Sequence, residues 1–141
     1  MILGGCVIGK GMHFVGHSDA DVLLHAITDG LLSAAGLPDI GELFPNTSEE
    51  NRGRDSGEML SIAMACVRKA GYELVNLDAV VQLEQPKLAS MKPQIRARIA
   101  EILGVDGSQV NIKGKTGEGI GEIGRAELAT AMCVVLLEHP D

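Results

Sequence analysis

The chain has 141 residues, of which 45% are apolar and only 2% aromatic, and its formal net charge at pH 7 is -7. This length suits one domain whose core is built from aliphatic side chains. The acidic balance, without a cluster of lysines and arginines, argues against nucleic acid or an anionic membrane as the partner.

The cysteines Cys6, Cys66 and Cys133 are scattered and odd in number, without a Cys-x-x-Cys motif. This usage predicts free thiols in a reducing compartment. The start of the chain lacks the basic region of a signal peptide, and no apolar run approaches the roughly 20 residues of a membrane helix. A cytoplasmic protein is therefore expected.

Glycines, prolines and capping residues divide the chain into seven predicted elements. In chain order these are a strand at 2–8, a helix from Ser18 or Asp19 to about Ala35, a helix at 55–70, a strand at 73–83, a helix at 94–103, a strand at 109–113 and a strand at 127–137. The last segment is long enough for a helix, but its β-branched residues favour a buried strand. The expected fold is α/β (α+β), a two-layer sheet-and-helix domain that spans residues 1–141 as a single unit.

Four polar residues spaced by four, His17, Asp21, His25 and Asp29, interrupt an otherwise apolar segment. On a helix, positions four apart lie on one face, so this spacing predicts a polar stripe. Burying the stripe without partners would cost roughly 2–7 kcal/mol per uncompensated group, so each group must meet solvent, another polar group, a metal or a ligand. Two interpretations remain open: a solvated helix face, or a metal or phosphate site at the helix N-terminus.

The glycine-rich segment 115–124 contains two patterns that imitate nucleotide-binding motifs. The Gly-x-Gly-x-x-Gly run that begins at Gly119 matches the dinucleotide fingerprint, but only 17 residues follow it and they favour a strand, so we reject it. The run Gly114-Lys115-Thr116 resembles the end of a P-loop, but Gln109 stands where the first glycine is required. The segment is either a flexible hairpin loop or a site in which this lysine and threonine, with Glu118, hold a phosphate and a hard cation.

Several separate blocks of the chain are informative when their order and spacing are considered together. They are His17-Ser18-Asp19-Ala20-Asp21 with His25 and Asp29, the run from Asp39 to Pro45, Asp55-Ser56, Gln85-Pro86-Lys87, Asn111-Ile112-Lys113, and Thr116 with Glu118. Together they resemble the 2-C-methyl-D-erythritol 2,4-cyclodiphosphate synthase family, and the resemblance covers residues 1 to about 137.

The resemblance implies an enzyme of the non-mevalonate isoprenoid pathway. Its substrate would be 4-diphosphocytidyl-2-C-methyl-D-erythritol 2-phosphate, whose 2-phosphate attacks the terminal phosphorus of the diphosphate, expels CMP and closes the cyclodiphosphate ring. The resemblance also implies a homotrimer with its sheets facing the central axis and an active site between adjacent subunits. In-line phosphoryl transfer depends on positioning and charge neutralisation, which fits the polar residues of these blocks.

The resemblance further implies roles for individual residues. His25 would be a ligand of zinc, and Glu118 would contact a second divalent ion, Mg²⁺ or Mn²⁺, on the diphosphate. His17 and Thr116 would be catalytic, because they stabilise charge on the reacting phosphates. The expected substrate-binding residues are Ser18 at the methylerythritol phosphate, Asp39 and Gly41 at the erythritol hydroxyls, Phe44 and Asn46 in the loop that follows, Lys87 and Lys115 at the nucleotide and its phosphates, and Arg125 at a central cavity that accepts isoprenoid diphosphates.

The chain departs from the family's pattern at three places. The family begins with a strand that carries Asp-x-His, two further zinc ligands, and no Asp-x-His precedes His17 here. Asn46 stands where aspartate is usual, and Glu122 where an apolar or aromatic residue is common. The expectation is an enzyme whose N-terminal segment is truncated or misassigned. The alternatives are a metal-deficient, non-catalytic trimer that binds isoprenoid diphosphates, and an unrelated small metal-binding interaction domain.

Overall fold

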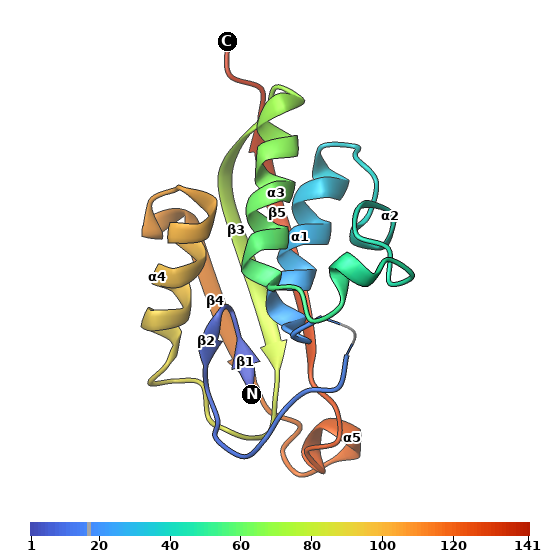
Figure 1. The fold of residues 1–141 in the computed structure, drawn as a ribbon. Coiled ribbons are helices and arrows are strands. Elements are labelled where there is room, and N and C mark those ends of the chain that lie inside the picture. Colours follow the sequence, from blue (N-terminus) through green and yellow to red (C-terminus); the bar gives the residue numbers. More distant parts are fainter. Residues whose placement is uncertain (17) are drawn as a thin grey trace.

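The computed structural model describes residues 1–16 and 18–141, which form a sheet layer covered by a helix layer (Figure 1). The sheet has three strands in the order β4-β3-β5. The central strand β3 (Glu73–Gln82) pairs in parallel with β4 (Val110–Lys115) and antiparallel with β5 (Thr130–Glu138). The predicted α/β class and the predicted final strand are therefore confirmed.

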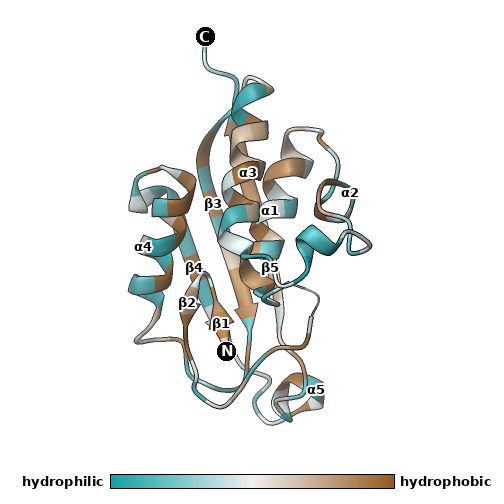
Figure 2. Ribbon diagram, viewed as in Figure 1, coloured by the Kyte–Doolittle hydropathy of each residue, from teal (hydrophilic) through white to brown (hydrophobic). Residues whose placement is uncertain are grey.

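Successive side chains on each strand point to opposite faces of this sheet, and the two faces differ in burial. On β3, Leu77, Ala79 and Val81 are buried beneath the helices, and the residues between them point to the other face. On β5, Met132 and Val134 are each 76% exposed, although both are apolar. Figure 2 shows the hydrophobic colouring that runs along β3 and β5. One face of the sheet thus forms the core, and the other leaves apolar side chains uncovered.

Three long helices form the second layer. They are α1 (Val22–Ala34), α3 (Ser56–Lys69) and α4 (Lys92–Leu103), all close to their predicted ranges. Helix α1 packs on β5, α4 packs on β4, and α3 lies against both helices (Figure 1). Gly30 permits the close approach of α1 to the sheet, because a Cβ atom there would lie 3.0 Å from Cγ2 of Val135.

The sequence predicted one strand at 2–8, but the structure has a small hairpin of two strands there. Strands β1 (Ile2–Leu3) and β2 (Cys6–Val7) pair antiparallel around Gly4 and Gly5, whose φ angles are +61° and +74°. These left-handed conformations suit glycine, so the glycine pair makes a turn rather than an interruption. The hairpin closes the core next to α1 and α4.

Short helices occupy segments that the sequence did not predict as helical, and one of them includes Gln109, where a strand was expected to begin. They are α2 (Ile40–Leu43), the 3-10 helices η1 (Glu49–Asn51) and η2 (Gly107–Gln109), and α5 (Gly121–Gly124). Each is only three or four residues long, which is too short for an amphipathic pattern to reveal it. Within the described residues, no helix is long and apolar enough to cross a membrane.

Candidate functional site

A cavity of about 370 Å³ lies beside the start of α1 and brings together five of the predicted site residues. Helix α1, helix α2, the residues before α1 and the 44–51 segment all contribute to its wall. Its lining includes Ser18, His25, Gly41, Phe44 and Asn46. The fold therefore brings residues from separate blocks of the sequence to one cavity, which has both polar and apolar walls.

The imidazole of His25 is held at the edge of this cavity by two hydroxyl groups. Its Nε2 lies 2.7 Å from Oγ of Ser56 and 3.1 Å from Oγ of Ser18. Ser56 is fully buried, and its hydroxyl also contacts the carboxylate of Asp19, which accepts the Ser56 backbone N–H at 2.9 Å. His25 is thus the end of a hydrogen-bonded chain that links α1 to the N-terminus of α3.

The predicted polar stripe is wrong for Asp21, because α1 begins one residue after it. Asp21 is the N-cap of α1, a role that the sequence assigned to Ser18 or Asp19. Its fully buried carboxylate accepts backbone N–H groups from Gly4, Gly5 and Leu24 at 2.9, 2.8 and 3.1 Å. Burial raises the pKa of Asp21, and these three donors oppose the rise. Asp21 therefore joins the hairpin to the helix and does not face a ligand.

The loop after α1 is held by polar side chains that also shape the cavity wall. Asp29 accepts the backbone N–H of Ile40 at 2.8 Å, and Asp39 caps α2 by accepting that of Glu42 at 2.9 Å. Phe44 is buried under the guanidinium of Arg54, whose Cζ lies 5.0 Å from the ring centroid. Asp39 is therefore beside the cavity as a helix cap, and it is not part of the lining.

A second cavity, of about 160 Å³, contains three other predicted residues. Lys87, Lys115 and Thr116 line it together with Lys92 and apolar side chains of the 83–89 segment. Neither Lys87 nor Lys92 makes an ion pair with any described residue. Two free ammonium groups beside backbone and hydroxyl donors form a pocket suited to an anionic ligand.

The loop that follows Thr116 is anchored by Glu84, which the sequence analysis did not identify. The Glu84 carboxylate accepts backbone N–H groups of Gly117 at 2.8 Å and Gly119 at 3.2 Å. Between them, Glu118 has a φ angle of +51°, which is unusual for a residue with a side chain. The sequence did offer one signal for this role, because Glu84 is an acidic residue two positions after a buried strand.

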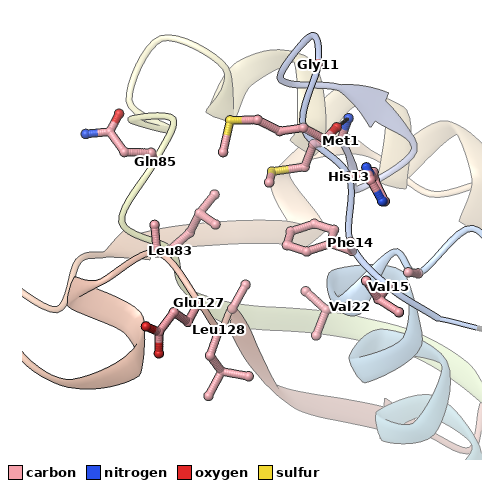
Figure 3. Close-up of a pocket in the computed structure, with 14 residues that line it drawn as sticks. Met1, Gly11, His13, Phe14, Val15, Val22, Leu83, Gln85, Glu127 and Leu128 are labelled. Carbon is pink, nitrogen blue, oxygen red and sulfur yellow. Dashed lines mark hydrogen bonds between the residues drawn. The ribbon is translucent and has the colours of Figure 1, made fainter.

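A third cavity, of about 570 Å³, is lined by both apolar and polar residues (Figure 3). It shares Val15, Ala20 and Val22 with the first cavity and Leu83 with the second. Figure 3 shows side chains of both its polar lining groups, such as His13 and Glu127, and the apolar residues that dominate it. Leu83 and Gln85, which line it, belong to the 83–89 turn that the family resemblance implies at the cytidine.

The described residues do not assemble a metal centre. Among residues 1–16 and 18–141, no three His, Cys, Asp or Glu side chains gather where they could hold a metal ion. Zinc sites use three or four such ligands, and His25 meets two serine hydroxyls instead. The predicted ligand Glu118 lies in the exposed loop before α5 and does not line the His25 cavity.

Two predicted residues lie elsewhere. Arg125 follows α5, where its Nε is 3.1 Å from Oε1 of Glu127 on an exposed surface. His17 lies outside the described residues, so its predicted catalytic role stays a prediction. The sequence placed Asp19 and Ser56 only at the starts of helices, and it did not predict their contact, which joins residues 37 positions apart.

Comparisons with known proteins agree over nearly the whole chain. The profile of the YgbB family matches residues 1–138. The 2-C-methyl-D-erythritol 2,4-cyclodiphosphate synthase of Rhodopirellula baltica is 48% identical over 137 residues, which are 97% of this chain and 82% of that protein. The synthase of the same name from Neisseria gonorrhoeae is 51% identical over 137 residues, 97% of this chain and 86% of that protein.

Solved structures show the same fold. The bifunctional IspDF from Campylobacter jejuni superposes with a TM-score of 0.96 at 40% identity, covering 100% of this chain and 38% of that larger chain. The CDP complex of IspF from Plasmodium falciparum gives a TM-score of 0.87 at 33% identity, covering 99% of this chain and 83% of that one.

Proposed function

The chain belongs to the YgbB family, and we propose that it converts 4-diphosphocytidyl-2-C-methyl-D-erythritol 2-phosphate into 2-C-methyl-D-erythritol 2,4-cyclodiphosphate and CMP. One observation carries this proposal: relatives at 48% and 51% identity over 97% of the chain are synthases named for this cyclodiphosphate. The activity makes this chain a lyase of isoprenoid biosynthesis.

The first cavity is proposed to hold the methylerythritol phosphate. Ser18 and the exposed backbone at Gly41 offer hydrogen-bonding groups there, and the buried ring of Phe44 supplies an apolar wall. Asn46 lines the same cavity and provides a neutral amide that can both donate and accept. Asp39 caps α2 through Oδ1, and with Gly41 it is proposed to bind the erythritol hydroxyls.

The second cavity is proposed to hold the cytidine diphosphate part. Lys87 and Lys115 would neutralise its phosphates, and Thr116 would donate a hydrogen bond to the phosphoryl group under attack. An oxygen of the 2-phosphate then forms a bond to the terminal phosphorus, the bond from that phosphorus to the CMP oxygen breaks, and CMP leaves with the electron pair. The CDP complex of the related Plasmodium falciparum protein supports a nucleotide ligand.

We infer that the two cavities meet across neighbouring copies of the chain in a homotrimer. They share no lining residue, and within one chain a third cavity lies next to both of them. The uncovered sheet face supplies a surface for association, since Met132, Val134 and Leu136 are 76%, 76% and 56% exposed. On that face, Oδ1 of Asp78 is buried without a hydrogen-bond partner among the described residues. In the proposed homotrimer, Arg125 would point towards the trimer axis. An isoprenoid diphosphate would bind in the cavity at that axis.

The resemblance implies zinc and a second divalent ion, Mg²⁺ or Mn²⁺. We expect this chain to bind zinc weakly. One imidazole, that of His25, is available where zinc sites use at least three protein ligands. Metal analysis after dialysis should give well under one zinc per chain. A tightly held, stoichiometric zinc would show that other residues complete the site.

Product formation tests the proposed reaction directly. The chain is incubated with the diphosphocytidyl substrate and Mg²⁺ or Mn²⁺, and phosphorus NMR follows the cyclic diphosphate and CMP. Thr116→Ala should slow the reaction by about 10²–10³, the usual effect of removing one oxyanion-type donor. Glu122→Ala, at an exposed position of α5, is the control. Absence of turnover after an N-terminal segment with Asp-x-His is added, with an isoprenoid diphosphate still bound, would instead favour a non-catalytic binder.

A further inference from the structure

The hydroxyl of Ser56 has two polar neighbours and only one proton to share. Its Oγ lies 2.7 Å from Nε2 of His25 and contacts Oδ1 of Asp19. A carboxylate accepts hydrogen bonds and does not donate them, so the Ser56 proton must be directed at Asp19. The oxygen of Ser56 is then an acceptor towards His25.

The accepting role of Ser56 determines the state of the imidazole. A neutral histidine carries one ring proton, and a close contact to an acceptor requires that proton on the contacting nitrogen. We propose that Asp19 and Ser56 act as positioning residues that hold His25 in the tautomer protonated at Nε2, with the lone pair on Nδ1. The functional meaning of this assignment rests on the proposed reaction, but the tautomer itself does not.

The packing around the chain of hydrogen bonds is suited to this role. Ser56 is fully buried at the first turn of α3, and the Asp19 carboxylate is held by the backbone N–H groups of Ser56 and Asp21 at 2.9 and 3.1 Å. Asp19 therefore cannot rotate away from Ser56 without losing three hydrogen bonds. A fixed acceptor at the end of such a chain sets the ring orientation as well as the tautomer.

This tautomer of His25 also leaves the hydroxyl proton of Ser18 available at the cavity. If Nε2 carries the ring proton, it cannot accept from Ser18, whose Oγ lies 3.1 Å away. Ser18 therefore acts as a second acceptor of that proton, and its own hydroxyl proton remains available to a ligand in the cavity that it lines. The same network thus supplies a lone pair at Nδ1 of His25 and a donor at Ser18.

Nitrogen-15 NMR of the histidine-labelled chain, treated with a chelator at neutral pH, tests the proposal. The long-range proton–nitrogen pattern of His25, assigned by its loss in His25→Gln, should show Nε2 protonated and Nδ1 unprotonated. Ser56→Ala should give a mixture of tautomers, and Ser56→Thr, which retains the hydroxyl, should restore the original pattern. Ser61→Ala, at an exposed serine of the same helix, is the matched control and should leave the pattern unchanged.

Kinetics separate a positioning role from a general loss of structure. For Ser56→Ala we expect kcat to fall by about 10–100-fold, the effect of removing a group that orients a functional histidine, with KM nearly unchanged and recovery in Ser56→Thr. A wild-type His25 protonated at Nδ1 would overturn the proposal even if turnover is normal. Correct NMR patterns in a chain without turnover would instead refute the proposed reaction and leave the tautomer assignment intact.

Discussion

The carboxylate of Glu84 accepts the backbone N–H of Gly117 at 2.8 Å, which joins the end of the central strand to the glycine-rich loop. The second oxygen of the same carboxylate accepts the N–H of Gly119 at 3.2 Å. The intervening Glu118 has a left-handed backbone, and Thr116 precedes the pair. One side chain outside both cavities therefore holds the loop that carries two of the proposed functional residues.

Glu84→Ala should lower turnover more than it lowers stability. Hydrogen bonds to a charged group each contribute roughly 1.5–3 kcal/mol, but here the freed N–H groups lie in a loop that water can reach, so the loss of folding free energy should be at the low end. The loop would no longer hold Thr116 in place. Steady-state kinetics and urea unfolding measure the two effects, with Glu122→Ala as control. Normal kcat with a large loss of stability would contradict this role.

Asp21→Asn should destabilise the fold by about 1–3 kcal/mol, because the new amide group would oppose the N–H of Gly5. Burial raises the pKa of Asp21 in the folded chain, so the unfolded chain loses its proton first as pH rises. The carboxyl's contribution to stability is therefore greatest at acidic pH and declines as pH rises through the folded pKa. The asparagine variant does not titrate at this position.

The destabilisation by Asp21→Asn should consequently be larger at pH 4 than at pH 7. Urea unfolding of both proteins across this range measures the difference between their free energies of unfolding. If the difference grows with pH, the three backbone donors outweigh burial, and the folded pKa of Asp21 is depressed.

Much of the fold could be predicted because the long elements carry strong patterns. Helices α1, α3 and α4 bury regular apolar faces, and β3 alternates between Leu77, Ala79 and Val81 and the residues on its open face. The hairpin at Gly4 and Gly5 could not be foreseen, because its strands have two residues each and its turn is held by the distant Asp21.

The site was predictable only in part, for a related reason. Ser18, His25, Gly41, Phe44 and Asn46 were chosen from separate blocks, and the fold does bring them to one cavity. Their supporting partners are set by tertiary contacts between distant positions, such as Ser56 with His25 and Glu84 with Gly117. Local spacing can mark a residue such as Glu84 by its place after a strand, but it does not specify which distant residue it contacts.

Assembly should depend on the uncovered face of the sheet. Val134→Asp would place a charge in an interface that buries apolar side chains, which costs several kcal/mol unless the charge is paired. Sedimentation should show a trimer for the wild-type chain and a shift towards the 14.8 kDa monomer for the variant. Ile120→Asp is the matched control, since Ile120 is also exposed, at 78%, but lies outside the sheet. A monomeric wild-type chain would contradict the proposed trimer.

Complementation between two inactive variants tests whether the cavities belong to one site across neighbouring copies. His25→Ala damages only the first cavity and Thr116→Ala only the second. In a cyclic trimer made from both variants, each mixed trimer has one interface at which an intact first cavity meets an intact second cavity. Each mixed trimer therefore has one intact site in three, so the purified mixed trimers should show about a third of the wild-type activity. The two chains are co-expressed with different tags, and mixed trimers are purified through both. If the cavities work together within a single chain, no site in any mixed trimer is intact, and the activity should stay at the level of the separate variants.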